Sequence, residues 1–322
     1  MKIDEKIKRP PFLYKGDKVA LISPAYWLVG EAISQAAMVL AQWGLVPVIG
    51  QNVNSTDANA YAGTADERAD DLRRALEDDD IKAIVCVRGG YGCIHLLERI
   101  TLQTLSEHPK WLIGHDDITT LLNAEVAAGV MAIHGPMALQ IGSALEPSSG
   151  LLRNILSGWV PQYEMASHRY NHLGYAEGIL VGGNLTSIAS LSGSKFFLAP
   201  ERDIILFIEE LEEPLHCVDR FFYMLLLQGV LDRVKGIILG EFNAIRHDIQ
   251  YESVEQMLTH HLRQRQIPIC CGLPVGSNNC LPLIEGAPVK LEVTEGGARL
   301  TFDIEGHQQA FHTSKMETQL MR

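Results

Sequence analysis

The chain has 322 residues, 47% of them hydrophobic, and its formal net charge at pH 7 is −12. This acidic balance argues against a nucleic-acid or membrane partner, because neither would find a basic stripe to bind. No apolar stretch is long enough to span a bilayer. The six cysteines form no CxxC pair, and no apolar run follows a basic N-terminal start. We therefore expect a cytoplasmic protein with reduced thiols.

Strand, loop and helix patterns alternate through the first 130 residues. Short apolar runs predict buried strands at 19–22, 46–49, 81–87 and 111–114. Amphipathic segments predict helices at 31–43, 65–76 and 118–128. This alternation is typical of a parallel sheet with right-handed crossovers, whose ligands bind at the carboxyl ends of the strands.

The second half predicts further strands and one apolar helix. The strands are expected at 178–184, 204–210, 234–240, 289–293 and 298–302, and the helix at 218–228. The last two strands alternate with period two, which suits a small β domain. We therefore predict an α/β fold with a Rossmann-like N-terminal domain at 1–155, a link at 156–175 and a smaller β-rich domain at 176–322.

Five motifs occur in one order along most of the chain. They are Ser23-Pro24, Arg88-Gly89-Gly90-Tyr91-Gly92, Gly114-His115-Asp116-Asp117, Gly182-Gly183-Asn184-Leu185, and Phe207-Ile208-Glu209-Glu210 followed by Asp219-Arg220. Together they resemble the motifs of the LD-carboxypeptidases, serine peptidases that trim murein tetrapeptides, and of the related microcin-immunity peptidases. Five motifs in order favour this fold, but each site must be argued separately.

The resemblance implies that two members of the family's catalytic triad are replaced. In the family a serine attacks the amide, a histidine takes its proton and a glutamate orients the histidine. Asp116 stands at the serine position, Glu209 at the glutamate position and Ser277 at the histidine position. Removing a triad serine or histidine lowers turnover by roughly a million-fold. We therefore expect no ordinary serine-peptidase activity.

The resemblance also implies a retained ligand site. The backbone amides of Gly90 and Asp117 match the family's oxyanion hole, and backbone donors survive side-chain changes. Further residues are expected to bind substrate: Arg88, Gly89, Tyr91, Gly183, Asn184 and Ser277. Taken by itself, the glycine-rich segment Arg88-Gly89-Gly90-Tyr91-Gly92 could also be a plain turn from strand to loop with no ligand; with the other motifs, we favour a loop that faces a ligand.

Asp116 and Glu209 suggest a different chemistry. In the family's geometry both positions face one cleft from opposite domains, so the site would hold two carboxylates. Such a pair can divide into a general acid and a nucleophile or base, as in glycosidases. The alternative is that Asp116 caps the helix that begins near Ile118. The sequence leaves both interpretations open.

The histidines give no metal site. His115 and His134 are expected to pack, and His216 has no metal-ligand spacing to a partner. A solvated helix face is expected for His260 and His261. The chain has no zinc pattern, Walker loop or dinucleotide fingerprint, so we expect neither metal nor cofactor.

Three functions remain open. The first is a divergent enzyme that uses Asp116 and Glu209 on a muropeptide, amino sugar, glycoside or peptide-like substrate. The second is a catalytically silent protein that binds a muropeptide-like ligand. The third is a residual LD-carboxypeptidase or other amide hydrolase with another nucleophile, such as Ser23. The resemblance further implies a homodimer. Whether the protein turns over any substrate is left open.

Overall fold

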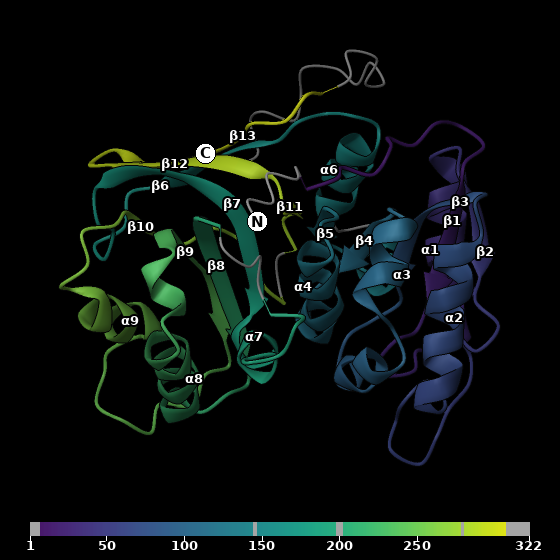
Figure 1. The fold of residues 1–322 in the computed structure, drawn as a ribbon, viewed down its shortest axis with the longest axis horizontal. Coiled ribbons are helices and arrows are strands. Elements are labelled where there is room, and N and C mark those ends of the chain that lie inside the picture. The colour runs from purple at the N-terminus through teal and green to yellow at the C-terminus, as the bar shows by residue number, and fades with distance from the viewer. Residues whose placement is uncertain (1–6, 144–146, 198–201, 278–279, 307–322) are drawn as a thin grey trace.

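The computed structural model of the protein describes residues 7–143, 147–197, 202–277 and 280–306. Two sheets lie side by side, each flanked by helices (Figure 1). This arrangement confirms the predicted α/β class, with a parallel-strand sheet in the N-terminal half and a second sheet after it. Within the described residues, no helix combines the length and apolar character needed to cross a membrane.

The first sheet has the strand order β11-β5-β4-β3-β1-β2. Its strands are β1 (Lys18–Ile22), β2 (Val46–Ile49), β3 (Ile81–Cys86), β4 (Trp111–Gly114), β5 (Ala132–His134) and β11 (Leu283–Glu285). All neighbours pair in parallel except β11, which pairs antiparallel with β5. A strand from the C-terminal half therefore completes the N-terminal sheet.

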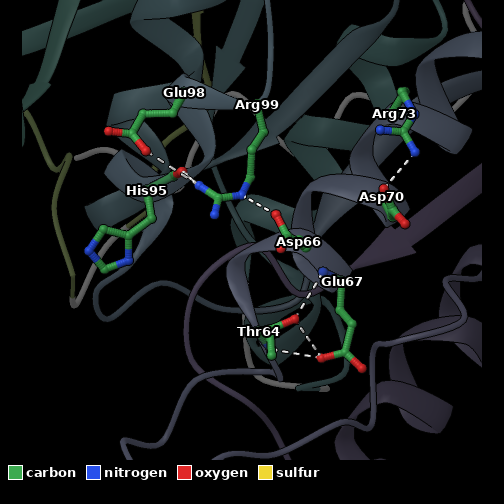
Figure 2. A network of polar contacts seen from close by, with 8 residues as sticks. All are labelled: Thr64, Asp66, Glu67, Asp70, Arg73, His95, Glu98 and Arg99. Atoms are coloured by element: carbon green, nitrogen blue, oxygen red, sulfur yellow. Dashed lines mark hydrogen bonds and ion pairs between the residues drawn. The ribbon is translucent and has the colours of Figure 1, made fainter.

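The helices that cover this sheet are α1 (Gly30–Gln42), α2 (Ala65–Glu77), η1 (Cys93–Glu98), α3 (Leu102–Glu107), η2 (Asp116–Ile118), α4 (Thr119–Ala127), α5 (Ala138–Ile141) and α6 (Pro147–Leu156). α1 and α2 bury one side against the sheet, whereas α4 is buried on nearly all sides. α2 begins at a capping box, in which Thr64 and Glu67 each accept the other's backbone N–H (Figure 2). Arg99, directly after η1, pairs with Asp66 of α2, so an exposed ion pair joins the end of η1 to this helix.

The second sheet has the order β10-β9-β8-β7-β12-β13-β6. Its strands are β6 (Gln162–Ala166), β7 (Gly174–Asn184), β8 (Ile204–Leu211), β9 (Val234–Asn243), β10 (Ile269–Cys271), β12 (Pro288–Thr294) and β13 (Gly297–Phe302). Its helices are α7 (Leu185–Ser190), α8 (Leu215–Leu227), η3 (Val230–Asp232) and α9 (Val254–Leu262). β7 to β10 are parallel, whereas β12, β13 and β6 join antiparallel.

Part of the segment expected as a link is a strand of this second sheet. β6 pairs with β13 at the sheet edge and buries only alternate residues. Five residues with two buried side chains give a weak periodic signal, which explains why the sequence did not indicate this strand.

The two halves share one hydrophobic core. It includes Leu21 and Val85 of the first sheet together with Leu180 and Phe207 of the second. Polar contacts cross the same boundary, since the side chain of Asn123 on α4 donates to the carbonyl of Gly182 on β7 at 3.0 Å. This packing holds the turn after β4 beside the end of β7.

Candidate functional site

Asp116 occupies a sharp turn between β4 and α4. Its φ is +58°, a left-handed conformation that aspartate tolerates better than most residues other than glycine. The turn directs the carboxylate at the glycine-rich loop, where Oδ2 accepts a hydrogen bond from the Gly90 amide at 2.7 Å. A Cβ atom at Gly89 would lie 2.3 Å from the same oxygen, so this close approach requires glycine.

Burial raises the pKa of Asp116 to about 6, and the charges of Asp117 and Glu210 act in the same direction. The backbone amides of Gly90 and Asp117 partly oppose this shift. These are the two amides that the sequence indicated as an oxyanion hole. In this structure, therefore, the carboxylate of Asp116 itself interacts with both donors. Its hydrogen bond to Gly90 joins two loops, which differs from a simple helix cap.

Asp117 anchors the other end of the glycine-rich loop. Its side chain is buried and accepts from the backbone amide of Cys93 at 2.8 Å. The buried Arg68 supports the same segment by donating to the carbonyls of Pro24 and Gly92. The Asp117 carboxylate is thus committed to holding the loop, and its contribution to a ligand would come through its backbone.

Glu209 lies at a bulge in β8, where the register with β9 shifts between Ile208 and Glu210. The residue is fully buried, and neither carboxyl oxygen has a hydrogen-bond partner in the described part of the chain. Burial raises the pKa of Glu209 well above its ordinary value, and the charges of Glu210, Asp116 and Glu241 add to this effect. This environment therefore favours the neutral, protonated form of the side chain.

Glu210 has the opposite environment, although sequence analysis did not separate it from its neighbour. Its carboxylate accepts from the side chain of Asn184 at 2.6 Å and from the amide and hydroxyl of Thr186 at 2.8 Å. The doublet of glutamates at a strand end was the available signal. Which of the two finds partners depends on Asn184 and Thr186, which folding brings beside Glu210.

Gly183 and Asn184, both expected to bind substrate, are buried and make packing contacts between β7 and α4. Gly183 has a φ of +114°, and a Cβ at this position would lie 2.5 Å from Thr119 Oγ1. The amide of Asn184 donates to the same hydroxyl at 3.1 Å, while its side chain accepts from the amide of Ser187 and caps α7. They hold β7 against α4.

Ser277 lies in the loop after β10 and is half-buried, while residues 278–279 are outside the described part. The preceding Gly276 packs against Glu241, with its Cβ position 2.8 Å from the Glu241 Cβ. Because Glu241 also acts electrostatically on Glu209, this loop approaches the same group of carboxylates.

Two buried histidines near the turn pack rather than face solvent. His115 Nε2 contacts the side chain of Gln140 at 3.1 Å, and burial lowers its pKa to about 4. The ring of His134 packs edge-on against Phe207 at 5.1 Å between centroids. Both imidazoles are neutral near pH 7, because burial also lowers the pKa of His134.

Aromatic side chains gather around the glycine-rich loop. Tyr26, Tyr61, Tyr91 and His95 form this aromatic cluster, with neighbouring ring centroids 5.4 to 6.2 Å apart. Tyr91 is 47% exposed, and the guanidinium of Arg88 lies 5.8 Å from the Tyr26 ring centroid. Of the cluster, the sequence indicated only Tyr91, because the other three lie outside the recognised motifs.

Ser23, the alternative nucleophile, is buried and donates its hydroxyl to the carbonyl of Val53 at 3.2 Å. Among the described residues, no group of three or more His, Cys, Asp or Glu side chains has a geometry that could hold a metal ion.

Comparisons with known proteins agree with this architecture. Residues 19–135 match the LD-carboxypeptidase N-terminal domain, and residues 177–291 match the LD-carboxypeptidase C-terminal domain. The murein tetrapeptide carboxypeptidase of Pseudomonas aeruginosa is 31% identical over 272 residues, which cover 80% of this chain and 87% of that protein. The probable murein peptide carboxypeptidase of Bacillus subtilis is 30% identical over 307 residues, or 92% and 94% of the two chains.

A solved structure shows the same fold. The muramoyltetrapeptide carboxypeptidase from Oxalobacter formigenes superposes with a TM-score of 0.79 and 26% identity, and the match covers 90% of this chain and 100% of that one. The chain therefore belongs to the LD-carboxypeptidase family.

Proposed function

We propose that Asp116 and Ser277 stand in place of the family's serine and histidine, and that this protein binds a muropeptide-like ligand without hydrolysing its amide bonds. The observation that carries this proposal is the 2.7 Å hydrogen bond from the Gly90 amide to Asp116 Oδ2. The ligand class follows from relatives whose names specify murein tetrapeptide and murein peptide.

The position of the Asp116 carboxylate opposes amide hydrolysis for two reasons. It takes a backbone donor that would otherwise stabilise the negative oxygen of a tetrahedral intermediate. When ionised, it also repels that developing charge. Burial raises the pKa of Glu209, so the ionised form that could act as a base is disfavoured.

The surroundings of the loop suit a ligand that has both ring and charged groups. The aromatic cluster offers flat apolar faces, of which Tyr91 is the most exposed. Arg88 adds a cation beside the same loop. A muropeptide carries sugar rings and carboxylates, so it matches this combination.

Calorimetric titration with a murein tetrapeptide, alongside mass-spectrometric assay of released D-alanine, tests the proposal. We expect binding without release. Asp116→Ala frees the Gly90 amide and removes a negative charge, so it should tighten binding by about tenfold, given that a charge-assisted hydrogen bond contributes about 1.5–3 kcal/mol. Glu164→Ala, which removes an exposed carboxylate paired with Arg299, should leave affinity unchanged. D-alanine release that Glu209→Ala abolishes would overturn the proposal.

A second candidate function is acid–base catalysis by Asp116 and Glu209. The raised pKa values of both groups favour it, since one carboxyl would hold a proton while the other ionises near pH 6. A turnover screen against muropeptides, amino sugars and glycosides tests this function. Activity that both Asp116→Asn and Glu209→Gln abolish would support it, and absence of turnover throughout would leave the binding protein.

A further inference from the structure

A second group of chemically reactive side chains lies at the start of α8. Five of the six cysteines are buried, and Cys217 is the one that is partly accessible. Its Sγ lies 3.4 Å from Nε2 of His216, and Nδ1 of the same imidazole lies 2.5 Å from Oδ2 of Asp248. Thiol, imidazole and carboxylate thus form a continuous chain of contacts.

The order of these contacts determines the role of each atom. A carboxylate only accepts hydrogen bonds, so Asp248 requires a proton on Nδ1 and leaves the lone pair of Nε2 facing the thiol. Asp248 is itself held in place, because its Oδ1 accepts from the His216 amide at 3.1 Å and Arg246 lies 3.9 Å from its Oδ2. The hydrogen bond from His216 lowers the pKa of Asp248, which keeps it ionised. Nucleophile, base and orienting carboxylate are all present.

The backbone around Cys217 distinguishes between two kinds of thiol chemistry. The amides of Cys217 and Val218 both donate to the carbonyl of Pro214, and the amide of Leu215 donates to Arg246. These donors are therefore occupied and do not form an oxyanion hole, which acyl transfer needs. Exchange between a thiol and a disulfide passes through no oxyanion and needs no such donors.

We propose that Cys217 is a His216-activated thiol that exchanges with low-molecular-weight disulfides. The thiol gives its proton to His216 Nε2, and the thiolate attacks one sulfur of the disulfide. A new bond forms between Cys217 Sγ and that sulfur as the original S–S bond breaks. The departing thiolate takes the proton from His216, so the products are a mixed disulfide on the protein and one free small thiol.

Incubation of the folded, full-length protein with glutathione disulfide tests the proposal, followed by intact-protein mass spectrometry and peptide mapping. We expect one glutathione per chain, attached at Cys217, and none on Cys217→Ser. With iodoacetamide at fixed neutral pH, His216→Gln and Asp248→Asn should each lower the rate of Cys217 alkylation by about tenfold, because an unassisted thiol is only a few per cent ionised there. In denaturant, both variants should react at the rate of the unaltered chain.

A matched control lies on the same helix. Asp219 pairs with His261 at 2.6 Å. Asp219→Asn should leave the alkylation rate of Cys217 unchanged, because the histidine that contacts this thiol is His216 and not His261. Glutathione on a buried cysteine instead of Cys217 would overturn the proposal. So would wild-type alkylation rates in both His216→Gln and Asp248→Asn, since the thiol would then be accessible but not activated.

Discussion

At the scale of single residues, Asp116 illustrates how one side chain balances opposing forces. Burial and two nearby carboxylates, Asp117 and Glu210, penalise its charge, whereas backbone amides stabilise that charge. The penalty is larger, so the group titrates near pH 6 and not in the ordinary range of aspartate. Glu209 lacks compensating donors in the described residues, so burial raises its pKa further above the ordinary value. The backbone donors, and not the distance from water alone, therefore distinguish the two carboxyls.

This balance makes stability depend on pH. Asp116 ionises near 3.8 in the unfolded chain and near 6 in the folded one, so between these values only the folded state keeps the proton. The free energy of unfolding therefore falls as pH rises through this window. Asp116→Asn removes this contribution. As pH rises through this window, the free energy of unfolding of the variant should fall less than that of the unaltered chain, and the difference should reach up to about 3 kcal/mol.

Urea unfolding at a series of pH values measures this difference, and other titrating groups cancel because they occur in both proteins. Asp203→Asn, at an exposed carboxylate paired with Lys235, serves as the control and should follow the unaltered chain. Identical pH curves for Asp116→Asn and the unaltered chain would contradict the assigned environment.

At the scale of elements, the contact between α4 and β7 determines where the site residues lie. Thr119 at the start of α4 fits against Gly183, and its hydroxyl accepts from the Asn184 amide. Asn184 in turn holds Glu210 and caps α7. The close packing of α4 against β7 therefore links the turn at Asp116 to the bulge at Glu209.

We predict that Gly183→Ala destabilises the protein by about 3 kcal/mol, since it combines a left-handed conformation with a methyl group forced onto Thr119. Gly129→Ala is the matched control. Gly129 also has a positive φ, of +81°, but open space surrounds its Cβ position, so only about 1 kcal/mol of conformational cost remains. Chemical denaturation of both variants gives the comparison, and equal losses would refute the proposed packing role of Gly183.

At the scale of the whole molecule, two features couple the halves. A strand from the C-terminal half joins the first sheet, and both sheets contribute to one hydrophobic core. β11 lies in the C-terminal half of the sequence, between strands β10 and β12 of the second sheet, but it completes the first sheet at β5. Leu283 of this strand is fully buried in the cluster that also contains Ile113 and Phe207. Loss of β11, or of this shared core, would therefore disturb the packing of both sheets.

Leu283→Ala should therefore lower the stability of the protein by about 2–5 kcal/mol through a core cavity. Hydrogen exchange should show reduced protection in β4 and β8 alike, because both strands contribute to the same cluster. Glu292→Ala, at an exposed position of β12, should change neither. Protection lost in the first sheet alone would indicate two independent cores.

Much of the secondary structure could be predicted from local pattern. The expected strand at 81–87 is β3 (Ile81–Cys86), and the expected helix at 65–76 is α2 (Ala65–Glu77). β3 is an almost continuous run of buried residues, and the buried residues of α2 recur at helical spacing, so both patterns can be read locally. β10 and β11, at three residues each, are too short to carry a period and were not predicted.

The sequence by itself determined the α/β class, the family and the placement of Asp116 and Glu209 at strand ends, because motif order and periodicity are properties of neighbouring residues. Only the tertiary structure decided that Asp116 engages the Gly90 amide, that Glu209 lies buried without a partner, and that Asp248 reaches His216 from 32 positions away. Burial, charge and hydrogen bonding depend on groups that folding brings together from distant parts of the chain. Sequence spacing alone contains no measure of those distances.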